Sequence, residues 1–513
     1  MDKSPKEIAI EKGKRELEKG ISTATNVARL MGLGEVIYYL HIMRVLRLTE
    51  FHSNYNKTKE QVLKPIMHHL NDAYRYILQL LIKYASKKFV LEEKVGFYNK
   101  DLVTELTRFV MELNYKYEAN TFLTMTPKLE VYGERNQHVK LNLLDILEDP
   151  NLSKYMFYGA RVELDNEFEI NSLLKKDDYF NKFKKEYGPF EDLFLNEFGI
   201  TISEFIDLID FMLTNFESKI KENLDKYVYI DNETIDIQAE GTMIQMSAAF
   251  FQDKKTLIDK FGDKIIRVLD RLTFDVKKFN DKELRYNQIN RQPLINYGTQ
   301  YIISPDLLLD CLFVNTHYSF LENVSSKDEY KKRFSETFLN QIAEISAKYR
   351  FKEVGRNLEL YNNKQQLGDI DLILKSDKEE YLYIEAKDHN IPMDVQIHIQ
   401  EDVEKRLHYL KEHWEAKVLK RIEHLKLNHS KYGLPSEFTY IIVSRSPEII
   451  SHFSHLNVFT LNEYEVYLGE GDLSTTFEII EKKLYNNYDS NLTTEELKEI
   501  QKAFGDDVRF EKE

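Results

Sequence analysis

Two short stretches decide the fold of the C-terminal half of this chain: GDIDLIL at residues 368–374 and YLYIEAK at residues 381–387. Both alternate between apolar and polar residues with period 2, as strands with two different faces do. The connection at residues 375–380 is polar and has the length of a hairpin loop. The pattern therefore predicts an antiparallel hairpin that is symmetric about Lys378.

The register of this hairpin places Asp371 opposite Glu385 and Asp369 opposite Lys387. It also keeps the apolar residues of both strands on one shared face. That face comprises Ile370, Leu372, Leu374, Leu382, Ile384 and Ala386. Two facing carboxylates repel each other, so a sheet avoids such a pair unless something compensates. We expect a divalent cation, with a lysine nearby, to supply the compensation.

Composition and charge limit the class of protein. With 513 residues, of which 42% are hydrophobic, the chain is long enough for two or three domains with proper cores. Its single cysteine, Cys311, lies in an apolar run and cannot form an internal disulfide, which favours a reducing cytoplasm. The most apolar early run, residues 31–46, is too short and too charged to span a bilayer. We expect a cytoplasmic protein without a signal peptide or membrane span.

The net charge of −15 argues against a generally basic nucleic-acid coat. It does not exclude a nuclease, because only the local field at the groove acts on the substrate.

The spacing of apolar residues divides the chain into three regions. Residues 1–120 show helical spacing, residues 121–285 are mixed and mainly helical, and residues 286–513 alternate between helices and strands. In the middle region we expect short strands at 122–125 and 129–132, and a hairpin at 227–237. We also expect helices at 202–224 and 257–279. Nothing before about residue 285 indicates chemistry.

The third region predicts an α/β module. A helix at 330–349 precedes a strand at 356–360 and the hairpin; a long charged helix at 394–427 and strands at 438–443 and 457–460 follow. This order is typical of a mixed central sheet flanked by helices. The whole chain is then α+β, with a large, mainly helical N-terminal region before the module.

The polar face of the hairpin suits phosphodiester hydrolysis. That reaction needs an activated water and neutralisation of charge on the phosphate, which carboxylate-bound Mg²⁺ or Mn²⁺ supplies. A lysine beside the metal can orient or deprotonate the water. Asp371, Glu385 and Lys387 meet this requirement, and the carbonyl of Ala386 could add an oxygen ligand.

Asp371 followed after a short hairpin by Glu385-Ala386-Lys387 resembles the signature of the PD-(D/E)XK nuclease superfamily. The run GDIDLI at 368–373 resembles its variant with glycine and an acid before the catalytic aspartate. The resemblance covers roughly residues 290–465. It implies a restriction-endonuclease-like module and a nuclease that depends on Mg²⁺ or Mn²⁺ and cuts DNA, less often RNA. The proline that names the family is absent, as in many of its members.

The resemblance also implies a further acid on the helix before the sheet. Glu336 fits that place, and Glu344, two turns later, is its rival. The implied metal ligands are therefore Asp371, Glu385 and Glu336, with Lys387 as the fourth catalytic residue. Asp369 could instead support Lys387 or take the place of Asp371 at the metal.

The long charged helix is the candidate nucleic-acid surface, with Gln400, Lys405 and Arg406 as candidate contacts. Some family members place a glutamine and an aromatic residue there, which Gln400 (or Gln396) and Tyr409 match loosely. The helix is rich in basic residues: Lys405, Arg406, Lys411, Lys417, Lys420, Arg421 and Lys426. They indicate either a phosphate-contacting surface or an ordinary solvated helix with ion pairs.

The sequence lacks the motifs of several other enzyme classes. It has no zinc-site spacing of the H-E-x-x-H type, no Walker-type loop and no G-x-S-x-G elbow. We predict a metal-dependent endonuclease, and a role in bacterial restriction or antiphage defence is a hypothesis from its architecture. The N-terminal region would serve recognition, regulation or assembly, as a homo-oligomer or with a partner protein. Two alternatives stay open: a helical scaffold protein with an inactive nuclease-like module, and nucleic-acid binding without cleavage.

Overall fold

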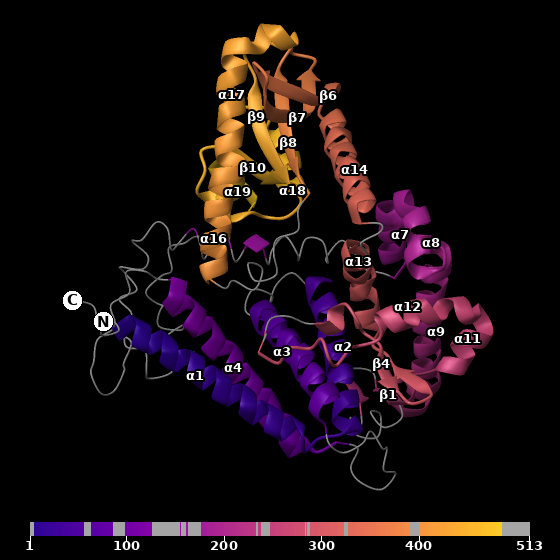
Figure 1. Cartoon of the computed structure of the whole chain (residues 1–513). Coiled ribbons are helices and arrows are strands. Elements are labelled where there is room, and N and C mark those ends of the chain that lie inside the picture. Colours follow the sequence, from indigo (N-terminus) through magenta and orange to yellow (C-terminus); the bar gives the residue numbers. More distant parts are fainter. Residues whose placement is uncertain are drawn as a thin grey trace. The chain divides into compact units, whose positions relative to one another are not determined.

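The structure, a computed structural model, describes most of the chain. The described residues are 5–55, 63–85, 98–125, 154, 158, 161–162, 176–231, 234–237, 247–282, 284, 288–322, 327–388 and 400–484. They form two compact units, each discontinuous in sequence (Figure 1). The C-terminal unit comprises residues 1–11, 120–170 and 331–513, and the N-terminal unit comprises residues 12–119 and 171–330.

This division differs from the three consecutive regions suggested by the sequence. The segment around Tyr158 and Val162 belongs to the C-terminal unit, because both side chains are buried in one of its cores. No local pattern in the sequence predicts such a long-range contact.

Helices dominate the described residues between 5 and 322, and a mainly helical character was predicted up to residue 285. The longer ones are α1 (Pro5–Ala28), α2 (Leu33–Tyr55), α3 (Leu63–Tyr84), α4 (Lys100–Met125), α7 (Lys176–Tyr187), α8 (Glu191–Phe198), α9 (Ile202–Tyr227), α11 (Lys254–Phe261), α12 (Ile266–Leu272) and α13 (Pro305–Glu322). Short 3-10 turns are η1 (Gly188–Phe190), η2 (Ser247–Phe250), η3 (Asp263–Ile265) and η4 (Gln288–Asn290).

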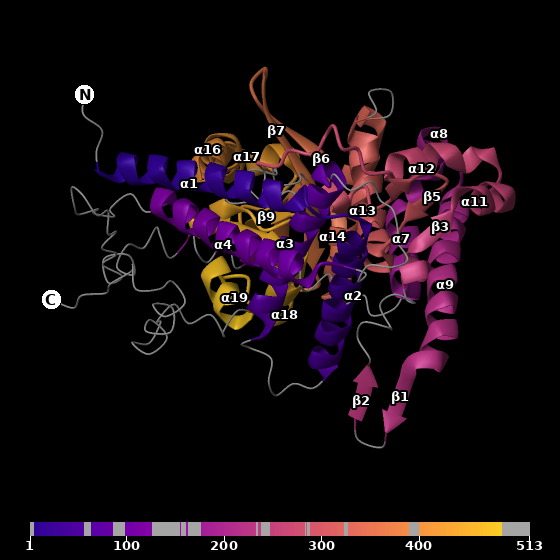
Figure 2. The same cartoon turned by 90° about the horizontal axis from the view of Figure 1, so that it is seen from below.

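Two small sheets accompany these helices. The predicted hairpin is present as β1 (Val228–Asp231) and β2 (Thr234–Ile237), which follow α9 directly (Figure 2). An antiparallel sheet has the order β3-β5-β4. Its strands are β3 (Phe251–Asp253), β4 (Ile295–Tyr297) and β5 (Gln300–Ile302).

Two local predictions were wrong. Residues 122–125 are helical, because α4 continues to Met125 instead of giving way to a strand; residues 129–132 lie outside the described part. The helix expected from 257 to 279 is interrupted at Gly262, where φ is +80°, and α12 ends at Leu272. A left-handed backbone cannot continue a right-handed helix, and glycine adopts it without steric cost.

The interior of the N-terminal unit combines aromatic packing with partly buried ion pairs. Phe194 stacks on Phe198, and both contact Phe205. Asp310 of α13 accepts from Arg47 of α2 at 2.9 Å and from Arg75 of α3 at 3.1 Å. Cys311, next to Asp310, is fully buried, as expected for a core thiol.

The C-terminal unit is built on a five-stranded mixed sheet with the order β10-β9-β8-β7-β6. Strands β6 (Phe351–Asn362), β7 (Gln365–Ser376) and β8 (Tyr381–Lys387) pair antiparallel. Strands β9 (Thr439–Ser444) and β10 (Asn457–Thr460) continue in parallel from β8. The predicted mixed sheet and its order of elements are therefore confirmed.

Helices flank this sheet. α14 (Lys327–Lys348) precedes it, and α16 (Gln400–Leu410) runs through a π-helical turn, η5 (Lys411–Glu415), into α17 (Ala416–Asn428). The segments α16, η5 and α17 form one long helix (Figure 1). The remaining elements are η6 (His429–Tyr432), η7 (Ile449–His452), α18 (Leu461–Glu470) and α19 (Phe477–Leu484).

The hairpin register is the predicted one, since Leu372 pairs with Ile384 and Leu374 with Leu382. These four residues pack against α14, α18 and α19. The opposite face is buried as well, with Ile373 and Tyr383 against α16 and α17. Ile370 belongs to this second core, so its predicted place beside Leu372 was wrong. It follows Gly368, whose φ of +111° departs from strand geometry.

Among the helices that the structure describes, none has the length and apolar character needed to cross a bilayer.

Candidate active site

Strands β7 and β8 bring together three of the four predicted catalytic residues. Asp371 follows Ile370 on β7, and its Oδ2 accepts a hydrogen bond from the backbone N–H of Ala386 at 2.7 Å. Lys387 Nζ forms an ion pair with Glu385 Oε1 at 2.6 Å. The pairing of β7 with β8 reaches Leu372 and Ile384, and Asp371 and Glu385 are the next residues on the two strands. Two carboxylates and one ammonium group therefore lie close together where β8 ends.

The two carboxylates disfavour each other's charge. Burial raises the pKa of Asp371 to about 7, and the negative charge of Glu385 adds to the effect. The charge of Lys387 and the hydrogen bond from Ala386 act in the opposite direction. This is the electrostatic conflict that the sequence indicates, and a cation between the carboxylates would relieve it.

The structure adds a cation that the sequence analysis did not place here: Arg421 of α17. Its Nη1 donates to Glu385 Oε2, which also accepts from the hydroxyl of Tyr440 at 3.1 Å. Both ends of this contact are buried, with Glu385 only 4% and Arg421 only 6% exposed. The prediction that Arg421 belongs to a solvated basic face is therefore wrong.

A signal for Arg421 exists in the sequence. It stands three residues after Val418 and four before Leu425, and both of these are buried against the sheet. A charge on the apolar stripe of a helix needs a partner inside the protein.

Gly368 allows the guanidinium of Arg421 to lie against the backbone of β7. The guanidinium donates from Nε to the carbonyl of Leu367 at 3.2 Å and from Nη1 to the carbonyl of Asp369 at 2.9 Å. A Cβ at Gly368 would lie 2.6–2.8 Å from the guanidinium atoms. The φ of +111° also favours glycine. Glycine at 368 therefore serves both the backbone conformation and the close approach of Arg421.

Lys387 has an aromatic neighbour from the same long helix. Its Nζ lies 5.9 Å from the ring centroid of Trp414, and Arg406 lies over the same ring at 5.6 Å. Trp414 belongs to the π-helical turn η5, a feature that is frequent at functional sites.

Glu336 is not brought into this cluster. Its side chain is exposed on α14. The pKa of Arg356 on β6 is raised mainly by its hydrogen bond to Glu353, and the charge of Glu336 adds to this effect. Glu344, the rival, is exposed as well. The hydroxyl of Ser335, next to Glu336, instead bonds to Asp388. Within the described ranges no group of three His, Cys, Asp or Glu side chains could hold a metal ion.

Two carboxylates nevertheless suit a small hard cation. Mg²⁺ is commonly bound by one or two carboxylates, with water and substrate phosphates completing its shell. Asp371 and Glu385 provide that donor chemistry, and the raised pKa of Asp371 marks a position short of positive charge. Asp369 contributes its backbone carbonyl to Arg421, and its charge also raises the pKa of Asp371.

The three candidate nucleic-acid contacts differ in their surroundings. Arg406 is largely buried and paired with Glu448, at 3.3 Å from Nε to Oε2, so its charge is used inside the protein. Lys405 is exposed. Gln400 begins α16, but its side chain lies outside the described part. Further exposed lysines lie on the same long helix, namely Lys411, Lys417, Lys420 and Lys426.

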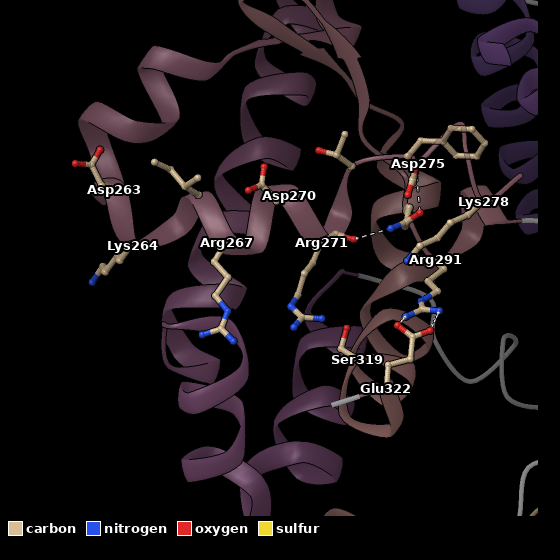
Figure 3. Close-up of a pocket in the computed structure, with 14 residues that line it drawn as sticks. Asp263, Lys264, Arg267, Asp270, Arg271, Asp275, Lys278, Arg291, Ser319 and Glu322 are labelled. Carbon is tan, nitrogen blue, oxygen red and sulfur yellow. Dashed lines mark hydrogen bonds and ion pairs between the residues drawn. The ribbon is translucent and has the colours of Figure 1, made fainter. Parts of the chain in front are cut away.

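A separate cavity of about 880 Å³ lies in the N-terminal unit, beside α12 and the last turn of α13 (Figure 3). Arg267 and Arg271 line it from α12, and Arg291, which lines it too, pairs with Glu322 through two 2.6 Å bonds. Arg271 pairs with the buried Glu197, and Arg267 donates to a backbone carbonyl. The protein's own groups thus engage these cations, and we assign no ligand to the cavity.

No family model matches this chain, and no solved structure matches it.

Proposed function

We propose that this protein is a metal-dependent nuclease that hydrolyses phosphodiester bonds, with a restriction-endonuclease-like module in its C-terminal unit. The observation that supports the proposal is the cluster of Asp371, in the middle of β7, with Glu385 and Lys387 at the end of β8. An ordinary sheet has no reason to place a half-buried carboxylate beside a buried one, whereas a site for a divalent cation does.

Each residue has a role in this proposal. Asp371 and Glu385 would hold Mg²⁺ or Mn²⁺, which supplies charge neutralisation at the phosphate and a more acidic water. Lys387, held by Glu385 and faced by Trp414, places a positive charge where negative charge develops during hydrolysis. Glu336 remains a candidate third acid only if its helix approaches the cluster in the substrate complex.

The exposed lysines of α16, η5 and α17 are the proposed substrate surface. Lysine charges that release counterions from a phosphate backbone give salt-dependent affinity without sequence preference. DNA is the favoured substrate by the family resemblance, with RNA second. A cytoplasmic role in restriction or antiphage defence, with the helical N-terminal region serving recognition, a partner protein or a homo-oligomer, completes the proposal.

The test is a cleavage assay on the purified full chain. Circular, linear and single-stranded DNA and an RNA of matched length are incubated with Mg²⁺, with Mn²⁺ and with EDTA. We expect metal-dependent cleavage that EDTA abolishes and that D371N, E385Q and K387M reduce by at least about 100-fold.

The matched control is D377N, which removes an exposed carboxylate from the turn of the same hairpin. It should cleave like the wild type. Absence of cleavage of every substrate with both metals, from a folded protein, would refute the enzymatic proposal.

A second candidate function is a scaffold with an inactive nuclease-like module. The observation that favours it is that Glu385 already has a cation on each of its oxygens, Lys387 and Arg421. In that case D371N should raise the free energy of unfolding by relieving repulsion, in a wild-type protein that cuts nothing.

Nucleic-acid binding without cleavage is the third candidate. It predicts affinity that is strongly salt-dependent, resides in the lysine-bearing helix and is indifferent to metal.

A further inference from the structure

One continuous helix contacts both charged partners of the candidate site. Trp414 in η5 faces Lys387, and Arg421, two turns later in α17, pairs with Glu385. The helix thus controls the surroundings of two of the three clustered residues, although it contributes none of them.

Glu385 is saturated by the protein itself. Its Oε1 is paired with Lys387, and its Oε2 receives both Arg421 and the hydroxyl of Tyr440. A carboxylate held in this way is fixed in orientation, and two cations already compensate its charge. A divalent cation that approaches Glu385 must compete with them.

Arg421 cannot simply follow Glu385 toward a metal. Its guanidinium is anchored independently, by the carbonyls of Leu367 and Asp369 on either side of Gly368. Its positive charge therefore stays beside the site whichever way the carboxylate turns. At a separation of a few ångströms and an effective dielectric constant near 20, such a charge changes a cation's affinity by at least about tenfold.

We propose that Arg421 is a positioning residue with two opposing effects. It orients Glu385 for the reaction, and its positive charge weakens the binding of the divalent cation. The inference rests on the proposed nuclease function and adds how the metal affinity of that site is set. It predicts that cation affinity and cleavage rate respond in opposite directions when the charge at position 421 is removed.

The experiment measures Mn²⁺ binding to the full-length protein without substrate, by electron paramagnetic resonance or calorimetry, and cleavage in parallel. R421M removes the charge, and R421K keeps it but loses the planar fork. We expect R421M to bind Mn²⁺ at least about tenfold more tightly and to cleave at least about tenfold more slowly at saturating Mn²⁺. R421K should bind Mn²⁺ within about threefold of the wild type.

K364M is the control, because Lys364 is an exposed cation in the turn between β6 and β7, outside the proposed substrate surface. It removes the same charge from the solvent side and should change neither measurement. R421Q is a second neutral variant, judged by the same criterion if R421M does not fold.

The outcomes separate the two proposals. If the wild type binds Mn²⁺ and cleaves, but the folded neutral variants bind Mn²⁺ no more tightly, only the inference about Arg421 is wrong. A purely structural arginine would give that result, together with a loss of thermal stability. If the wild type neither binds Mn²⁺ nor cleaves, the proposed function fails and the inference fails with it.

Discussion

At the scale of single residues, the site is a balance of four charges. Asp371 and Glu385 repel each other, and Lys387 and Arg421 both form ion pairs with Glu385. The compensation is therefore one-sided: Glu385 is fully satisfied, while Asp371 keeps a raised pKa. Because of this asymmetry, an added cation would stabilise the charged form of Asp371 more than it would stabilise Glu385.

The raised pKa of Asp371 predicts how stability depends on pH in the absence of metal. The folded protein holds a proton on Asp371 up to a pH of about 7, whereas the unfolded chain releases it near pH 4. The free energy of unfolding should therefore fall as the pH rises from about 4 to about 7, by an amount on the order of 2–4 kcal/mol from this group.

Denaturant titrations of the wild type and D371N in EDTA at several pH values isolate this contribution. The amide at 371 cannot titrate, so the difference between the two proteins should grow in favour of D371N as the pH rises. A difference that is flat between pH 4 and 7 would show that Asp371 is ionised throughout that range.

Gly368 and Arg421 should be energetically coupled. G368A forces a side chain into a φ of +111° and brings its Cβ to 2.6–2.8 Å from the guanidinium. We expect a loss of stability of about 1–3 kcal/mol from the backbone strain, plus a term for the displaced arginine. In the R421M background only the strain should remain.

A double-mutant cycle with G368A, R421M and the double mutant measures this coupling by denaturant unfolding. A coupling energy above about 0.5 kcal/mol is expected for groups in contact. Strictly additive effects would mean that Arg421 moves aside without cost. G433A, at a left-handed position with open space around its Cβ, is the control for strain alone.

At the scale of elements, the π-helical turn η5 sets the rotation of α17 relative to α16. One residue more than an α-helix would use is accommodated there. Trp414 and Arg421 reach Lys387 and Glu385 in this arrangement. Both the π-helical turn and the apolar stripe of the helix therefore determine which of its side chains reach the site.

Deletion of His413 tests this element. Its side chain is exposed, and removing one residue should convert the π-helical turn to α-helix and rotate one half of the helix by about 100°. Because the buried residues of α16, Val403 and Leu410, and those of α17, Val418 and Leu425, then cannot all face the sheet, we expect a stability loss of several kcal/mol, the usual result of displacing packed apolar groups.

The substitution H413A keeps the residue count and is the matched control. It should leave the melting temperature within a few degrees of the wild type. If the deletion is tolerated as well as the substitution, the π-helical turn has no part in placing Arg421.

At the scale of the whole molecule, the chain forms two units that interleave in sequence. The C-terminal unit includes a segment that lies about 300 residues before its last helices. Arg161 of that segment is fully buried and forms two bonds with Glu463 of α18, at 2.6 and 2.5 Å. Breaking such a pair leaves an uncompensated buried charge, which costs about 3–5 kcal/mol.

Two units with separate cores predict two unfolding transitions. E463Q should lower the transition of the C-terminal unit, through the stranded charge of Arg161. D310N should lower the other transition, because it weakens the ion pairs of Asp310 with Arg47 and Arg75. Differential scanning calorimetry of the full chain shows which transition each variant shifts. A single transition shifted by both would mean that the chain unfolds as one cooperative body.

The sequence by itself determined what depends on neighbouring residues. Period-2 alternation and a short polar loop specify the hairpin and its register, so the pairing of Leu372 with Ile384, next to Asp371 and Glu385, follows from local pattern alone. Helical spacing likewise located α9 and α14 to within a few residues. These features are local because backbone hydrogen bonds and side-chain periodicity act over a few residues.

Only the tertiary structure decided which charges meet. Arg421 and Arg406 turn inward to Glu385 and Glu448, and Glu336 stays outside the cluster. Arg161 crosses about 300 residues to reach Glu463. The physical reason is that a buried charge must be paired wherever the chain brings a partner, and that partner is chosen by the packing of whole elements.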